Sequence, residues 1–164
     1  MRSLFSFPNP VNEVSARLVA AGVVLMSVLA IAFDLKWLTV VIAYGFVARV
    51  LTGPTLSPLG QLVTRVITPR LGLAARPVAG PSKRFAQGIG AAFSLSALVL
   101  TGLGYWTAAQ AVLGLLVVAA TLEAALGICL GCMTFGVLMR AGVVPDEVCE
   151  RCNDIWATPR GAAV

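Results

Sequence analysis

The chain contains four long apolar runs, and they predict its main structural elements. The runs cover residues 16–33, 37–52, 88–105 and 108–139. A helix needs roughly 20 residues to cross the hydrocarbon core of a bilayer, with a usual range of about 17–25. The first, third and fourth runs meet this length, whereas the second is short unless Arg49 lies within it.

Lipid surroundings decide which structure these runs adopt. Inside a bilayer every backbone donor and acceptor must be bonded within the protein, so helices are the natural structure. We therefore predict an all-α integral membrane protein, a four-helix transmembrane bundle. Residues 1–142 would form the four-span membrane domain, and residues 143–164 would form a cytoplasmic tail.

Composition strengthens the membrane interpretation. Hydrophobic residues make up 59% of the 164 and charged residues 12%, and the mean hydropathy is +0.92. Soluble domains carry roughly 45–50% apolar and about 25% charged residues. A small protein exposes too much surface to hide such an excess, which argues against a soluble enzyme. Histidine is absent, so catalysis or metal binding by histidine is excluded.

The basic residues predict the orientation. The link between the third and fourth runs has no basic residue, and the link between the first and second has only Lys36. The central segment 53–87 has five basic residues and no acidic one, and more basic residues flank the runs at both ends. The positive-inside rule then places both termini and this segment in the cytoplasm, with the protein in the cell membrane. The net charge of +5 is thereby assigned to topology and to anionic lipid, so no nucleic-acid partner is expected.

The central segment itself contains a helical pattern. Apolar residues recur at helical spacing between Pro58 and Pro69. Such a helix would lie in the cytoplasmic interface, with basic residues toward lipid headgroups. A helix packed on the bundle is the equal alternative.

Two charged residues fall inside the apolar runs. Both runs would start at the outer face, near Trp37 and Gln110. Arg49, 12 residues beyond Trp37, then lies about 18 Å deep, and Glu123, 13 residues beyond Gln110, about 20 Å deep. Charges at such depth are costly and need a partner. We expect an Arg49–Glu123 ion pair that fixes helix register, or a functional Glu123 that moves a proton or tunes thiol pKa values.

All four cysteines fall in the last 36 residues, and they form two pairs. Cys129 and Cys132 lie at the end of the fourth run, and Cys149 and Cys152 in the tail. The pattern C-x2-C-x16-C-x2-C lies within the spacing typical of zinc sites. Four thiolates could bind one zinc ion and hold the tail, in a scaffold without catalytic activity.

The same pairs suit redox chemistry. In a C-x2-C pair one thiolate attacks and the other resolves the mixed disulfide. A helix would place Cys129 and Cys132 on one face. Cytoplasmic thiols stay reduced, which disfavours permanent disulfides and favours a catalytic, sulfur-carrying or metal role. The spacing does not choose between zinc and a thiol or sulfur relay. A third hypothesis is a subunit of a transporter for a sulfur compound.

Small residues in the third run predict close packing. They would allow another helix to approach, either within the bundle or in a homo-oligomer. The residues are Gly88, Gly90, Ala91, Ala92, Ser94, Ser96 and Ala97.

Four sequence blocks carry a family resemblance. They are Pro10–Glu13, Gly53–Leu59, Pro81–Gly90 and Leu122–Cys132. Through them the chain resembles a bacterial integral membrane family catalogued as domain of unknown function 4395.

This resemblance implies a four-span protein and a Glu…Cys-Leu-Gly-Cys element formed by Glu123, Cys129 and Cys132. It also implies thioredoxin-like or sulfurtransferase proteins as partners. Where family members usually have Arg-Tyr, this chain has Thr55-Leu56, so no role of those two residues carries over.

Overall fold

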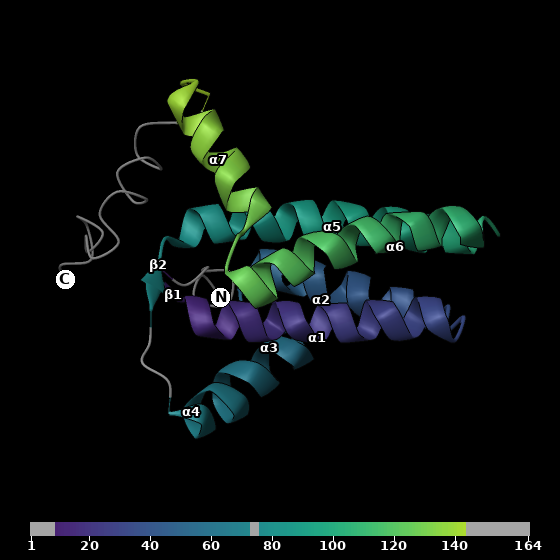
Figure 1. Cartoon of the computed structure of the whole chain (residues 1–164), viewed down its shortest axis with the longest axis horizontal. Coiled ribbons are helices and arrows are strands. Elements are labelled where there is room, and N and C mark those ends of the chain that lie inside the picture. The colour runs from purple at the N-terminus through teal and green to yellow at the C-terminus, as the bar shows by residue number, and fades with distance from the viewer. Residues whose placement is uncertain (1–8, 73–75, 144–164) are drawn as a thin grey trace.

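The computed structural model describes residues 9–72 and 76–143, and most of these residues are helical (Figure 1). The helices are α1 (Glu13–Ala32), α2 (Leu38–Thr52), α3 (Pro58–Leu62), α4 (Thr68–Leu71), α5 (Gly80–Gly102), α6 (Trp106–Thr121) and α7 (Leu130–Arg140). Two π-helical turns, η1 (Val63–Ile67) and η2 (Leu122–Leu126), continue α3 and α6. Two short strands, β1 (Val11–Asn12) and β2 (Pro77–Val78), pair in antiparallel register.

Four helices lie side by side along the long axis of the molecule (Figure 1). In this bundle α1 packs on α2, α2 on α5, α5 on α6, and α6 on α1. Small residues bring the helices close together. At Gly90 of α5 an added Cβ would lie 2.1 Å from the Phe46 ring of α2, so only glycine fits this contact. The small-residue stripe of the third run is therefore used within the bundle at this point.

Three helical stretches are long and apolar enough to cross a membrane: Glu13–Ala32, Gly80–Gly102 and Trp106–Leu126. The second predicted span, α2, is a shorter apolar helix of 15 residues.

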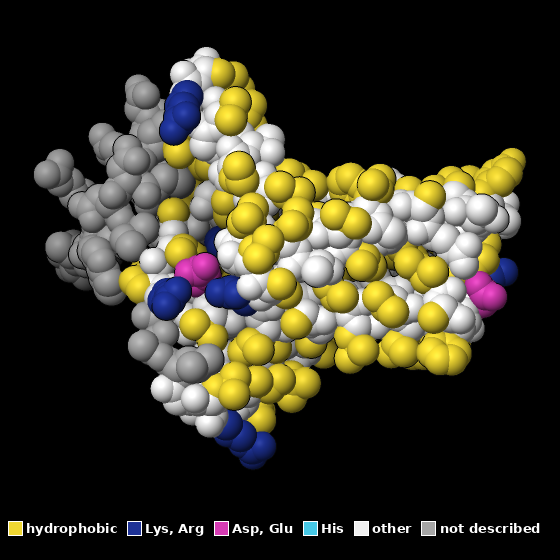
Figure 2. Space-filling model, in the orientation of Figure 1, with side chains coloured by type: hydrophobic (Ala, Val, Ile, Leu, Met, Phe, Trp, Pro, Cys, Tyr) yellow, Lys and Arg dark blue, Asp and Glu magenta, His cyan; other side chains and the backbone are white. Residues whose placement is uncertain are grey.

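The core of the bundle is mostly hydrophobic, but many large apolar side chains are also exposed on its surface. The bundle buries hydroxyl groups such as those of Ser27, Thr39 and Ser94, while Leu25, Leu115 and many other large apolar side chains are exposed (Figure 2). The helices are compatible with a membrane protein.

The two turns at one end of the bundle are tied together. Asp34, with a left-handed φ of 51°, ends the turn after α1. Its carboxylate accepts hydrogen bonds from Trp106 Nε1 at 2.7 Å and Gln110 Nε2 at 3.2 Å, both on α6. Lys36 lies over the Trp106 ring at 5.8 Å. This end therefore holds α1 and α6 in register.

The helical segment between α2 and α5 packs against α1. Ser57 caps α3, where its side chain accepts from the Gly60 amide, and Pro58 follows at the first helical position. Val63 is 1% exposed and Leu59 packs on the core, which fixes the segment on the bundle. The helix that the apolar spacing predicts is thus present.

The fourth apolar run is not one helix, contrary to expectation. The helix formed by α6 and η2 ends at Leu126, and Gly127 follows in the left-handed region with φ of 71°. The chain then restarts as α7, which leaves the bundle at a steep angle (Figure 1). Gly131 of α7 approaches α5 so closely that a Cβ would lie 2.6 Å from Ala86 Cα. The rings of Phe85 and Phe135 pack with centroids 5.3 Å apart.

Candidate functional site

The break between η2 and α7 positions the first cysteine pair. Cys129 is the N-cap residue of α7, and Cys132 lies in its first turn. Both are free thiols, Cys129 buried and Cys132 half-buried. The pair thus sits at a helix N-terminus, where the helix dipole favours a thiolate. A single continuous helix through residue 139 would have placed both thiols mid-helix, without this field.

A cavity of about 500 Å³ opens beside the two thiols. Cys129 and Cys132 line it together with Lys83 and Ser82 from the first turns of α5. Glu13, at the start of α1, and Met133 also line this cavity. The buried Cys129 is therefore accessible through a space that also contains an ammonium group.

The environment separates the pKa values of the two thiols. A hydrogen bond from Cys132 lowers the pKa of Cys129 to about 7, against burial and the Glu123 carboxylate, which raise it. The Lys83 ammonium also favours the Cys129 thiolate. The same hydrogen bond and burial raise the pKa of Cys132 far above its ordinary value. Cys129 is thus the thiolate of the pair near neutral pH, and Cys132 keeps its proton.

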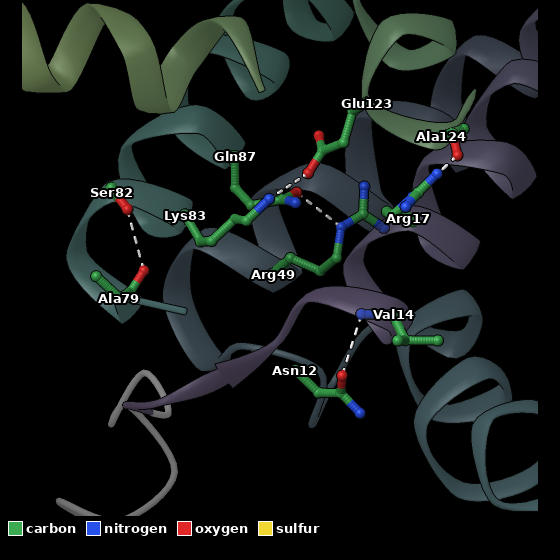
Figure 3. A network of polar contacts seen from close by, with 10 residues as sticks. All are labelled: Asn12, Val14, Arg17, Arg49, Ala79, Ser82, Lys83, Gln87, Glu123 and Ala124. Atoms are coloured by element: carbon green, nitrogen blue, oxygen red, sulfur yellow. Dashed lines mark hydrogen bonds and ion pairs between the residues drawn. The ribbon is translucent and has the colours of Figure 1, made fainter. Parts of the chain in front are cut away.

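Lys83 is tied to Glu123. Its Nζ lies 2.7 Å from Glu123 Oε1, in a pair whose side chains are 8% and 16% exposed (Figure 3). The expected Arg49–Glu123 pair is not formed. Helix α5 begins at Gly80, eight residues before the third apolar run, so Lys83 is part of the bundle and reaches the level of Glu123 first. The depth estimate pairs Glu123 with Arg49 because the predicted third span begins at residue 88, which leaves Lys83 in the central segment 53–87.

Arg49 has other partners. Its Nε donates to Gln87 Oε1 at 2.9 Å and its Nη1 to Ser57 Oγ at 3.1 Å. Its guanidinium carbon lies 4.5 Å from the centre of the Phe46 ring. Figure 3 shows Lys83, Gln87 and Arg49 converging below Glu123. Arg49 therefore does not line the cysteine cavity, whereas Lys83 does.

The end of η2 is held by α1. Arg17 donates from Nε to the Ala124 carbonyl at 3.1 Å and from Nη2 to the Ala125 carbonyl at 2.7 Å. These carbonyls lie in the last turn before Gly127, where a helix leaves backbone acceptors without partners. Arg17 thus fixes the point at which the helix ends and the cysteine segment begins.

The sequence patterns identified Cys129, Cys132 and Glu123, and the structure brings these three near one another around Lys83. Lys83, Ser82 and Arg17 were missed as parts of a site. Lys83 and Ser82 follow Pro81, a residue favoured at the first helical position, and this signal could have extended the third helix.

The second cysteine pair and a metal site are not tested by this geometry. Cys149 and Cys152 lie outside the described residues. Within residues 9–72 and 76–143, no three cysteine, aspartate or glutamate side chains gather in a way that could hold a metal ion.

Comparison with known proteins places most of the chain in one family. The model described as "Domain of unknown function (DUF4395)" matches residues 11–140. No curated protein and no solved structure shows significant similarity to the chain.

Proposed function

Because this chain belongs to the DUF4395 family, whose description names no reaction, we propose its function from the cysteine geometry. We infer that it is a membrane protein whose Cys129–Cys132 pair exchanges disulfides with a thioredoxin-like partner at the cytoplasmic face. The observation that carries this proposal is a C-x2-C pair at a helix N-terminus, beside Lys83 in a cavity.

A four-span topology accounts for the bundle. Helix α2 of 15 residues would complete the four spans, since its neighbours α1 and α5 are long enough to cross. Exposed Trp37 and Tyr105 lie in the two turns at one end, as interfacial aromatic residues do. Arg17 and Arg84 contact the other end of the bundle through backbone carbonyls. By the positive-inside rule, that basic end faces the cytoplasm of the cell.

The proposed exchange has two steps. The Cys129 thiolate attacks one sulfur of a disulfide in the partner, a new S–S bond forms, and the other partner sulfur leaves as a thiolate. Cys132 then loses its proton and attacks Cys129, which releases the second partner thiol. The partner disulfide gains two electrons and becomes a dithiol, while Cys129 and Cys132 become a disulfide. A dithiol protein resets the pair by the reverse reaction.

Two charged residues position the reactive thiol. Lys83 favours the thiolate electrostatically, and Glu123 holds Lys83 in place at 2.7 Å. Neither reacts itself.

A sulfurtransferase partner would use the same nucleophile differently. The Cys129 thiolate would attack the terminal sulfur of a donor persulfide, take that sulfur, and release the donor thiolate. This alternative keeps Cys129 as nucleophile but needs no resolving thiol.

The test uses the full-length protein, purified in a neutral detergent with its thiols reduced. Oxidised thioredoxin is added to the wild-type protein and to the Cys132→Ser variant. We expect two-electron reduction of thioredoxin by the wild type. The variant should accumulate a mixed disulfide at Cys129, and Cys129→Ser should form none.

Two controls keep this result decisive. Metal content and accessible thiols are measured on the same sample, and stoichiometric zinc with four unreactive thiols would overturn the exchange in favour of a zinc scaffold. Trapping only with a persulfide donor would replace exchange by sulfur transfer. No reaction with either probe would contradict both.

A further inference from the structure

A second cavity, of about 340 Å³, has Lys83 in common with the cysteine cavity. It is lined by residues of β1, the start of α1, the end of α2 and the segment from α3 to α4. Lys83 lines both cavities, whereas Arg49 and Gln87 line only this one. We call it the arginine pocket. It is far larger than a single water site.

Arg49 presents an unsatisfied charge there. The residue is 5% exposed, and its Nη2 has no hydrogen-bond partner among the described residues. Burying a guanidinium is costly, and a donor left unpaired adds to that cost. Buried polar groups are nearly always paired in native structures. Arg49, a residue that lines the cavity, therefore lacks an acceptor for one of its buried nitrogens within the described part of the chain.

The side chains that line the pocket carry an excess of positive charge. Among the described residues, no acidic side chain lines it, and Lys83 and Arg49 are its two cations. Lys83 already forms an ion pair with Glu123 at 2.7 Å, and the Glu123 carboxylate forms no ion pair with Arg49. One positive charge, that of Arg49, remains without a contacting anion.

The neutral groups that line the pocket can also donate hydrogen bonds to an anion. Ser15 and Thr68 face each other with their hydroxyl oxygens 3.0 Å apart, and either can turn to donate. Thr64 and the side-chain amides of Asn12 and Gln87 also line the pocket. A cation surrounded by hydroxyls and amides favours an acceptor with several oxygens and a negative charge.

We propose that the arginine pocket binds a tetrahedral oxoanion group, held by Arg49 Nη2 with support from Ser15 and Thr68. The group is a sulfate or phosphate. It could be a free inorganic ion or the headgroup of an anionic lipid, because both offer the same oxygens. This binding does not depend on the proposed thiol exchange.

The test measures binding to the full-length protein in a neutral detergent by titration calorimetry at constant ionic strength. The probes are inorganic sulfate, inorganic phosphate and phosphatidic acid in mixed micelles. We expect at least one probe to bind wild type and to lose about tenfold or more in affinity to Arg49→Gln. Arg65→Gln is the matched control, since Arg65 is exposed, and should bind as wild type.

A second variant keeps the test valid if Arg49→Gln fails to fold. Ser15→Ala with Thr68→Val removes two hydroxyls that bond each other, so neither partner is left unpaired. It should fold and lose affinity several-fold. The Cys129→Ser, Cys132→Ser variant should bind as wild type, which separates this result from the thiol chemistry.

Each outcome decides the proposal. Binding of sulfate or phosphate that these variants weaken supports a free anion as ligand, and binding of phosphatidic acid alone supports a lipid headgroup. The absence of binding by all three probes overturns the proposal. So does binding that neither Arg49→Gln nor the Ser15, Thr68 double variant reduces.

Discussion

At the scale of single residues, the interaction between the two described thiols gives them different acidities. It divides one ordinary pair into a thiolate and a protonated partner, since it lowers the pKa of Cys129 to about 7 and raises that of Cys132. Free cysteine has a pKa of about 8.5. In the proposed exchange, this division would give the nucleophilic role to Cys129 and the resolving role to Cys132.

This division predicts the pH dependence of alkylation. The rate of Cys129 modification by iodoacetamide should rise with pH around a midpoint near 7, because the reactive thiolate forms as pH rises through the pKa. Replacing Cys132 with Ala removes the hydrogen-bond donor and should shift the midpoint upward. Cys132→Ser keeps a donor and should shift it less. A wild-type midpoint above 8.5, measured by mass spectrometry of the labelled peptide, would contradict the assignment.

The Lys83–Glu123 pair predicts two variants with opposite effects on that midpoint. Lys83→Met removes a cation and should raise the Cys129 pKa, while Glu123→Gln removes an anion and should lower it. Each change leaves one charge buried, so each should cost about 3 kcal/mol of unfolding free energy. Urea unfolding gives the stability, and the alkylation profile gives the pKa. Shifts of the same sign in both variants would show that the pair acts only by supporting the fold.

At the scale of helices, the apolar runs predict where the bundle helices lie but not where they end. The lengths of the apolar runs predict the ends of α1 and α2 to within a few residues, because these ends coincide with changes from apolar to polar residues. It misses the start of α5, where Lys83 and Arg84 look like loop residues although Pro81 begins the helix. It also misses the break at Gly127, because the residues on both sides are equally apolar.

The candidate site depends on those two missed boundaries. The cysteine spacing is visible in the sequence, but the helix N-terminus at Cys129 exists only because the chain breaks before it. The partner of Glu123 likewise follows from the earlier start of α5. Sequence therefore identifies the candidate residues Cys129, Cys132 and Glu123, while their electrostatic neighbours require the fold.

The break itself predicts the outcome of a glycine substitution. Gly127→Ala forces a side chain into the left-handed region and places Cβ 3.1 Å from Glu13 Oε1, so it should destabilise the protein by about 1–2 kcal/mol. Gly136→Ala is the matched control within α7, where a Cβ meets nothing within 4 Å. It should stabilise by about 0.5–1 kcal/mol.

Thermal unfolding measures both glycine variants, and alkylation reports on the thiols. Because Gly127 sets the position of Cys129, the Gly127 variant should also move the alkylation midpoint, whereas the Gly136 variant should not. Equal stability of the two would show that the left-handed turn is unimportant.

At the scale of the whole molecule, the two ends of the bundle differ in kind. One end has two short turns joined by Asp34, Trp106 and Gln110. The other end has the strand pair, both π-helical turns, both cavities and α7 (Figure 1). Among the described residues, the candidate site thus lies at one end, which the proposed orientation places in the cytoplasm.

This polarity predicts a labelling pattern. A membrane-impermeant maleimide should leave Cys129 and Cys132 unmodified in intact spheroplasts and should modify them in inverted vesicles. Thr107→Cys, at the exposed start of α6 in a chain lacking the native cysteines, should show the reverse. Labelling of the native pair from outside would overturn the cytoplasmic placement.

The hold of Arg17 on the Ala124 and Ala125 carbonyls has a consequence for biogenesis. Its two hydrogen bonds join residues 107 and 108 positions apart. The ribosome therefore makes the arginine long before its acceptors, and these two hydrogen bonds form only after the last bundle helix has docked against the first. The end of η2, after which the cysteine segment starts, is therefore fixed only once these helices have assembled.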